Sequence, residues 1–138
     1  ANQGKYGKAI LDYTQAITIN PGYLKACLNR GRTYYLIKEY AKSILDFKRA
    51  IEIDPFDPRG YSGLGSSYCA MGNSKEAIIP LHKAIELNPD ITVAYYNLAL
   101  AYYYTNQYDL AIRYCDKAIE RGYKVSPELL GILRPYRK

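Results

Sequence analysis

Residues 24–57, with the sequence LKACLNRGRTYYLIKEYAKSILDFKRAIEIDPFD, set the pattern for the whole chain, because the same columns return every 34 residues. Four columns carry this repeat: a small residue at Gly31, Gly65 and Ala99, a tyrosine at Tyr34, Tyr68 and Tyr102, an alanine at Ala16, Ala50, Ala84 and Ala118, and a proline at Pro21, Pro55 and Pro89. A fixed period of this length indicates an array of stacked units. We therefore divide the chain, as one repeat domain over residues 1–138, into a half repeat (1–23), three full repeats (24–57, 58–91 and 92–125) and a final segment (126–138).

Each full repeat is expected to form two helices. In the first full repeat, apolar and small residues recur at three- and four-residue steps over 24–37 and again over 40–53. This spacing is the period of amphipathic helices. The half repeat supplies one such helix, over residues 5–19. Because Ala1 falls in the middle of a unit, we expect the natural chain to continue upstream; otherwise the unpaired face of this helix would dock on another chain.

The helix ends are predicted from turn and capping residues. Gly122 is expected to end a helix in the left-handed conformation. Residues 126–138 lack the remaining repeat columns, so we expect a capping helix in which Leu129, Ile132 and Leu133 cover the last helix pair. Side chains that cap helix N-termini are predicted at four positions, namely Asp57, Ser74, Thr92 and Ser126.

Two residues are unusual for their positions, namely Arg30 in its repeat column and Pro80 within a predicted helix. Arg30 stands in the column that holds Leu64 and Leu98, so we expect its stem to lie on apolar surface and its head to reach solvent or Asp12. A buried ion pair or a ligand contact is the alternative. Pro80 falls inside a predicted helix, where it removes one backbone hydrogen bond and is expected to kink the helix on its outer face.

The composition argues against most catalytic and metal chemistry. Three cysteines, Cys27, Cys69 and Cys115, lie far apart without a CxxC pair, so neither zinc nor any other cofactor is expected, and reduced thiols fit a cytoplasmic protein. His82, the single histidine, has no identifiable acid or nucleophile beside it and is expected on the outer surface of its helix. No apolar run is long enough to span a membrane. We therefore predict that the chain is not an enzyme.

Two helices in 34 residues with these columns resemble the tetratricopeptide repeat (TPR) family. Further columns agree, at Tyr6, Tyr40 and Tyr108 and at Ala9, Ala77 and Ala111. The resemblance implies an all-α fold, a right-handed superhelix of antiparallel helix pairs with about three and a half repeats and a C-terminal capping helix. It also implies that the first helices of the pairs line a concave groove, which in this family commonly binds an extended peptide or a partner helix.

The groove face can be read from the non-core residues of the predicted first helices. These residues are Lys25, Leu28, Asn29, Arg32, Tyr35, Leu36, Arg59, Ser62, Gly63, Ser66, Cys69, Ala70, Val93, Tyr96, Asn97, Leu100, Tyr103 and Tyr104. Ten of them are predicted to bind a partner, namely Lys25, Asn29, Arg32, Arg59, Ser66, Tyr96, Asn97, Leu100, Tyr103 and Tyr104. The set is basic at one end, small in the middle and rich in tyrosine at the other end, with no acidic member. It predicts a partner segment with acidic residues at one end and apolar or aromatic anchors at the other.

Some members of the family clamp a terminal carboxylate with a Lys/Asn/Asn/Lys/Arg set. Carried over to the full repeats, this set falls on Leu28, Arg32, Gly63, Val93 and Asn97, which do not match. A clamp of this kind is therefore not expected here.

Three classes of function follow. The leading hypothesis is a non-enzymatic scaffold that binds a protein or peptide in the groove. Binding of single-stranded nucleic acid is a weaker alternative: the net charge of +6 and 17 tyrosines favour it, but the cations are scattered and form ordinary helix-surface pairs such as Lys83 with Glu86. The third class is self-assembly into a homo-oligomer through residues 5–19.

Overall fold

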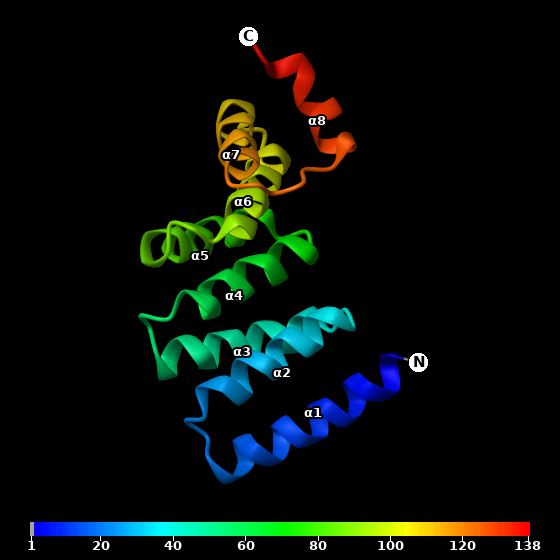
Figure 1. Ribbon diagram of the computed structural model, residues 1–138, viewed down its shortest axis with the longest axis vertical. Helices are drawn as coiled ribbons and strands as arrows, with labels where there is room; N and C mark the ends of the chain where they lie inside the picture. The colour runs from blue at the N-terminus through cyan, green and yellow to red at the C-terminus, as the bar shows by residue number, and fades with distance from the viewer. Residues whose placement is uncertain (1) are drawn as a thin grey trace.

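The computed structural model describes residues 2–138, and within this range the chain is helical and contains no strand (Figure 1). The elements are α1 (Asn2–Ile19), α2 (Leu24–Leu36), α3 (Tyr40–Ile53), α4 (Pro58–Ala70), α5 (Ser74–Leu87), α6 (Thr92–Tyr104), α7 (Tyr108–Glu120), α8 (Pro127–Leu133) and the short 3-10 helix η1 (Arg134–Tyr136). The helices predicted over 24–37 and 40–53 are confirmed to within one residue, and the helix predicted over 5–19 begins three residues earlier.

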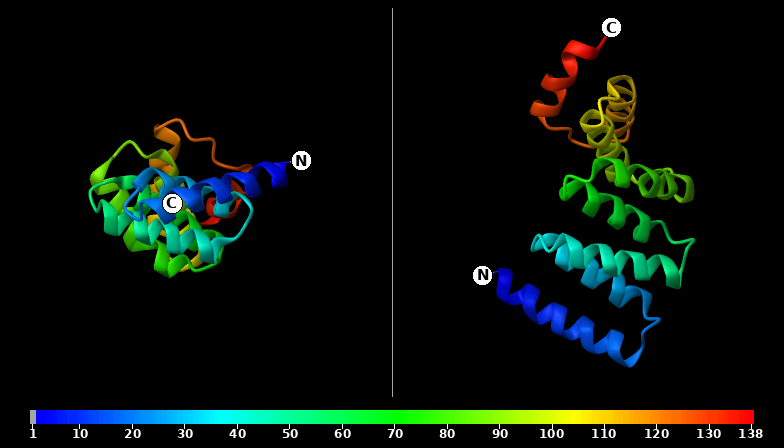
Figure 2. Two further views of the ribbon diagram at one scale, coloured as in Figure 1. Left: turned by 90° about the horizontal axis from the view of Figure 1, so that it is seen from below. Right: turned by 180° about the vertical axis from the view of Figure 1, so that it is seen from behind.

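The helices stack one on another, with α1 at one end of the molecule and α8 at the other (Figures 1 and 2). Each helix from α1 to α7 packs against the next one along the chain, and α4 also packs against both α2 and α6. Among the described residues, the second helices α3, α5 and α7 do not approach one another in this way. The first helices therefore form one continuous inner face, as predicted for a superhelix of helix pairs.

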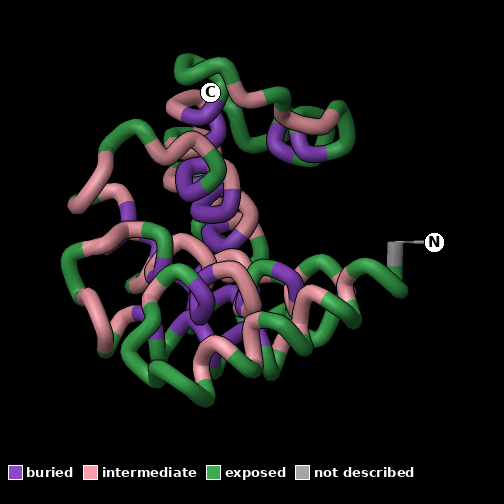
Figure 3. Tube along the Cα trace, turned by 60° about the horizontal axis from the view of Figure 1, so that its bottom comes forward, coloured by how far each residue is buried: buried purple, intermediate pink, exposed green. Residues whose placement is uncertain are grey.

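Apolar burial is distributed unevenly along the stack. The larger core cluster lies in the C-terminal half around Leu81, Leu98 and Leu133, whereas a smaller cluster surrounds Phe47 in the first full repeat. Figure 3 shows buried segments running through the middle of the molecule and into α8, while the described part of α1 is only exposed or partly buried.

The capping role of the last helix is confirmed for two of its three predicted residues. Leu129 and Leu133 are buried in the larger core cluster, whereas Ile132 remains 38% exposed. Two further contacts hold the tail that follows: Arg137 pairs with Asp116 at 2.7 Å, and the ring of Tyr136 stacks on that of Tyr108 with centroids 3.8 Å apart. The exposed cap of the array is thus attached by apolar, ionic and aromatic contacts.

Of the predicted caps, Asp57 and Ser126 are confirmed, because their side chains accept hydrogen bonds from backbone amides in the first turn. Ser74 and Thr92 are not caps, and each is already the first helical residue. The N-cap of α6 is Ile91, which occupies the same repeat column as Asp57. The repeat register therefore decides where these helices begin, even where the side chain in the cap column cannot accept a hydrogen bond.

The turns inside the helix pairs also follow the register. Lys38, Gly72 and Asn106 occupy one column and all adopt positive φ, at 65°, 84° and 64°. Gly122 has a φ of 85°, which confirms its predicted left-handed conformation. Helix α5 continues through Pro80 without interruption.

Candidate binding groove

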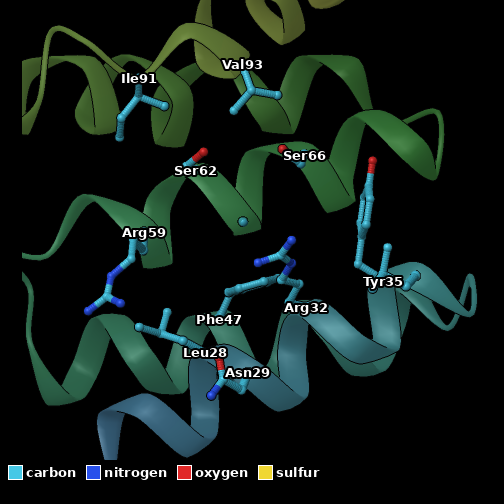
Figure 4. Close-up of a pocket in the computed structure, with 12 residues that line it drawn as sticks. Leu28, Asn29, Arg32, Tyr35, Phe47, Arg59, Ser62, Ser66, Ile91 and Val93 are labelled. Atoms are coloured by element: carbon cyan, nitrogen blue, oxygen red, sulfur yellow. The ribbon is translucent and has the colours of Figure 1, made fainter. Parts of the chain in front are cut away.

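The inner face contains a cavity of about 590 Å³ between α2, α4 and the start of α6 (Figure 4). Apolar, polar and basic residues line the cavity, and none of the lining side chains is acidic. The lining residues are Leu28, Asn29, Arg32, Tyr35, Leu36, Phe47, Arg59, Ser62, Gly63, Ser66, Ile91 and Val93. A cavity of this size falls within the range that encloses small ligands in proteins. It also offers room for several side chains of an extended segment.

Phe47 is a cavity residue that sequence reasoning placed only in the core. It belongs to α3, a second helix, and is buried, yet its ring lines the cavity. The ring reaches this position because Gly63 has no side chain: a Cβ added there would overlap the ring. A Cβ added at Gly31 would lie only 3.2 Å from ring carbons. The signal in the sequence was Gly63 itself, which replaces the asparagine found in the same column at Asn29 and Asn97.

The two arginines of the cavity differ in their partners. Arg59 donates to the carboxylate of Asp57, with the shortest contact at 2.6 Å, and this hydrogen bonding holds the pKa of the Asp57 carboxyl below its usual range. Arg32 is exposed and has no ion-pair partner among residues 2–138. In Figure 4 the guanidinium of Arg32 points toward the middle of the cavity, whereas that of Arg59 points to its edge. The prediction of a groove lined by cations did not take account of Asp57, whose carboxylate neutralises Arg59.

The structure divides the ten predicted groove residues into two groups. Four of them, Asn29, Arg32, Arg59 and Ser66, line the cavity. The remaining six lie outside its lining, namely Lys25, Tyr96, Asn97, Leu100, Tyr103 and Tyr104.

The tyrosines of this second group contact other tyrosines. Tyr96 stacks on Tyr123 with centroids 4.7 Å apart, and Tyr103 lies against the rings of Tyr104 and Tyr108. The neighbouring Asn97 is buried. Its side-chain amide donates to the hydroxyl of Ser66 at 2.8 Å, so part of its hydrogen-bonding capacity is used inside the protein.

Arg30 does not behave as the favoured interpretation predicted. Its guanidinium donates two hydrogen bonds to the buried carboxylate of Asp46, at 2.7 and 2.9 Å, and a third to the hydroxyl of Thr14 at 3.1 Å. The prediction of a solvated head or a contact with Asp12 was therefore wrong, and the alternative of a buried ion pair is correct. Arg30 pairs with Asp46 rather than with Asp12 because Asp46 lies on α3, directly against α2, and its carboxylate is shielded from water. This pair fastens α1, α2 and α3 together and does not line the cavity.

His82 was also misplaced by the sequence. It is half-buried rather than on an open outer surface, because residues of α6 and α7 cover its ring. Its Nε2 shares a hydrogen bond of 2.6 Å with the hydroxyl of Tyr102, and Tyr114 packs edge-on against it. Burial lowers the pKa of His82, and the nearby charge of Lys117 lowers it further.

The three cysteine thiols lie in environments that disfavour the thiolate form. Burial raises the pKa of the Cys69 thiol to about 12, so it remains protonated near neutral pH, and its Sγ donates to the carbonyl of Asn97 at 3.7 Å. Burial also raises the pKa of Cys27 and of Cys115. In the described part of the chain, no three histidine, cysteine or acidic side chains gather as a metal site would require. Nor does any described helix have the length and apolar character needed to cross a bilayer.

Solved structures with a similar arrangement of helices are known. The structure entitled "Crystal structure of MamA" is 29% identical, with a TM-score of 0.82 over 88% of this chain and 71% of that one. A second, "Crystal structure of MamA protein", is 29% identical, with a TM-score of 0.80 over 87% of this chain and 66% of that one. A third, "MamA 41-end from Desulfovibrio magneticus RS-1", is 22% identical with a TM-score of 0.78 over 88% and 68%, and it shows the fold alone.

Sequence comparison with families gives the same assignment. No curated protein matches this chain. Family models do match: one described as "Tetratricopeptide repeat" covers residues 24–57 and 92–121, a second with that description covers 1–23, and one described as "TPR repeat" covers 65–106. With these matches spanning most of its length, the chain belongs to the tetratricopeptide repeat family.

Proposed function

We propose that this protein is a non-enzymatic interaction scaffold that binds an extended segment of a partner protein in the cavity between α2, α4 and the start of α6. The observation that carries the proposal is the cavity itself, about 590 Å³ of open space on the inner face of a superhelix of helix pairs. Membership of the tetratricopeptide repeat family supports the general role of a protein–protein interaction scaffold.

The chemistry of the cavity favours a segment that is partly apolar and partly acidic. Leu28, Phe47, Ile91 and Val93 offer apolar contacts, and Arg32 offers a cation with no partner of its own in residues 2–138. Fully burying one large apolar side chain is worth about 1.5–3 kcal/mol, whereas an exposed ion pair contributes under about 1 kcal/mol. Apolar contacts should therefore supply most of the affinity, and Arg32 should supply selectivity for a negative charge.

We propose a different position along the groove for the apolar anchor point than the one expected from the sequence. The sequence placed it at the tyrosines of α6, but the tyrosines Tyr96 and Tyr103 already contact other rings. The apolar lining of the cavity lies instead on the first two full repeats and the start of the third, beside the basic end. We propose Tyr104 and Leu100 only as secondary contacts, for a segment long enough to continue along α6.

Calorimetric titration with acidic, amidated peptides tests this proposal. Arg32→Glu should weaken the binding of acidic peptides by about three- to tenfold, because it replaces an attraction with a repulsion at an exposed site. Leu45→Gln, at a 68% exposed position on the outer side of α3, is the matched control and should bind like the wild type. Equal affinities for all three proteins would contradict the groove assignment.

Self-assembly through α1 is a second candidate, because none of the described residues of this helix is buried. Its apolar face, at Ala9, Ile10, Tyr13, Ala16 and Ile17, is only partly covered. Light scattering over a range of protein concentrations would reveal such association, and Tyr13→Glu should abolish it. A concentration-independent monomer mass would exclude it.

A nucleic-acid role receives less support, since one of the two cavity arginines is held by Asp57. Binding of a labelled single strand that falls steeply with salt would revive this alternative.

A further inference from the structure

We infer that Gly63 and Phe47 form a side-chain subsite that selects one large apolar residue of the partner, and that Arg32 selects an acidic residue next to it. The inference rests on the proposed function and specifies the class of partner: an internal segment that carries leucine, methionine or phenylalanine one or two positions from aspartate or glutamate.

The first step is the gap left by Gly63. The same repeat column holds Asn29 and Asn97, and in the last repeat the asparagine occupies its space and donates to Ser66. At Gly63 no side chain stands between the cavity and the ring of Phe47. In the middle repeat the space beside Gly63 is therefore taken by the ring of Phe47, which gives the cavity an aromatic wall at the position that carries an asparagine in the flanking repeats.

The second step is that this wall is already in place before any partner arrives. Phe47 as a residue is only 6% exposed, and its ring sits between Gly31 and Gly63, where even one added carbon would be crowded or would overlap the ring. A surface that is fixed in advance loses little conformational freedom on binding, which improves affinity. Leu28, Ile91 and Val93 also line the cavity and add apolar surface to that of this ring.

The third step is the neighbouring charge. Arg32 and Phe47 line the same cavity, and the guanidinium points toward its middle (Figure 4). In an extended peptide, adjacent residues are about 3.3 Å apart and alternate ones face the same side. We therefore expect Arg32 to contact an acidic residue one or two positions from the anchor. Arg59, whose guanidinium is bound by Asp57, is not available in the same way.

A defined peptide set tests the subsite. The probes are fluorescein-labelled octapeptides with an alanine–glycine background, an amidated end that removes the terminal carboxylate, and two variable positions. The first position carries glycine, alanine, leucine, methionine or phenylalanine. The second, one or two residues away on either side, carries alanine, lysine or glutamate. Binding is measured by fluorescence anisotropy at moderate salt.

For the wild type, peptides with leucine, methionine or phenylalanine should bind roughly ten- to a hundredfold more tightly than their glycine counterparts. Glutamate beside the anchor should add a smaller gain over lysine. Ser62→Phe places a ring inside the cavity and should remove the preference for large side chains, whereas Ser62→Ala should keep it. Arg32→Glu should reverse the preference for glutamate without changing the preference for the anchor.

Two kinds of failure are distinguishable. If no peptide binds the wild type, or if binding ignores Ser62→Phe and Arg32→Glu alike, the proposed groove fails and the subsite fails with it. If acidic peptides bind and Arg32→Glu weakens them, but large and small anchors bind equally, the groove stands and the subsite is wrong. The variants change a partly exposed serine and an exposed arginine, so we expect both to fold. Circular dichroism checks their folding independently of peptide binding.

Discussion

The inner face of this protein is open between α2, α4 and the start of α6 (the open half) and closed where the rest of α6 packs with α5 and α7 (the closed half). Between α2 and α4 small residues such as Gly63 and Ser62 leave a cavity. Along α6 the side chains contact neighbouring segments instead: Tyr96 stacks on Tyr123, which follows α7, and Asn97 donates to Ser66 of α4. The backbone plan is the same in both halves. The difference teaches that small side chains on the inner helices leave a groove open. Large aromatic side chains at the same positions close it, because they pack against one another.

The closed half should be the more sensitive to the loss of packing. Leu81 is fully buried there, and its branched end fills the space where Gly65 has no side chain. Leu81→Ala should reduce the free energy of unfolding by about 2–5 kcal/mol, measured by urea denaturation followed by circular dichroism. Ile79→Ala, at an 81% exposed site on the same helix, should change it by less than about 0.5 kcal/mol. Similar losses in both variants would show that α5 is packed differently.

The first full repeat differs from the last in its ion pair. Asp46→Ala should cost about 3 kcal/mol, because it leaves the half-buried cation of Arg30 without its carboxylate. The double variant Arg30→Leu and Asp46→Tyr copies the residues of the last repeat, Leu98 and Tyr114, and leaves no buried charge. We expect it to recover most of the loss in the same denaturation experiment. A double variant as unstable as the single one would mean that the pair serves more than charge balance.

These two residues also show how far the sequence could predict the structure. The period of 34 residues, the helix pairs and the capping role of Leu129 and Leu133 follow from columns that repeat, since a repeated column has a repeated environment. Arg30 breaks its column, whereas Asp46 shares its own column with Asp12 in the half repeat, and the later repeats carry Pro80 and Tyr114 there. An exception such as Arg30 carries no periodic signal that could name its partner, so the ion pair could be named only as an alternative.

The candidate site was predictable to a similar extent. The helix faces that line the cavity follow from the register, which is why Asn29, Arg32 and Ser66 were found. The aromatic wall of the cavity was not predictable, because Phe47 belongs to a second helix and enters through the gap at Gly63. The contact of Arg59 with Asp57 was missed because Asp57 was assigned only to capping α4, and its carboxylate does both.

The two asparagines of one repeat column offer a direct comparison of the open and closed halves. Asn97→Ala should lower stability by about 1 kcal/mol, because a buried hydrogen bond to Ser66 is lost, and should leave peptide affinity nearly unchanged. Asn29→Ala should weaken peptide binding and leave stability nearly unchanged, since Asn29 is only partly buried and lines the cavity. Urea denaturation and anisotropy with the octapeptides measure the two quantities. The same response in both variants would remove the distinction between the halves.

A smaller effect is expected at the edge of the cavity. Arg59→Ala should weaken the binding of acidic peptides by no more than about two- to threefold, because this guanidinium already donates to Asp57. Arg32→Ala should weaken the same peptides more. The comparison is made by anisotropy at two salt concentrations, where the Arg32 effect should shrink as salt rises. If Arg59 proves the stronger determinant, the proposed position of the acidic residue moves toward α4.

The smallest expected effect is a pH dependence confined to the closed half. Burial and the charge of Lys117 lower the pKa of His82 in the folded state, whereas the unfolded chain takes up this proton near pH 6.5. Between these two values the unfolded state binds more protons, so stability should fall as the pH drops below about 6.5 and level off once the folded state is also protonated.

Because His82 is the single histidine, its ring proton gives one resonance whose NMR titration reports the folded pKa directly. The groups that face the ring are the hydroxyl of Tyr102, the ring of Tyr114 and the ammonium of Lys117, and none of them is acidic. A folded pKa at or above 6.5 would contradict this account. His82→Gln should remove the pH dependence of stability over this range. Peptide affinity should not follow the same titration, because the cavity of the open half contains no histidine.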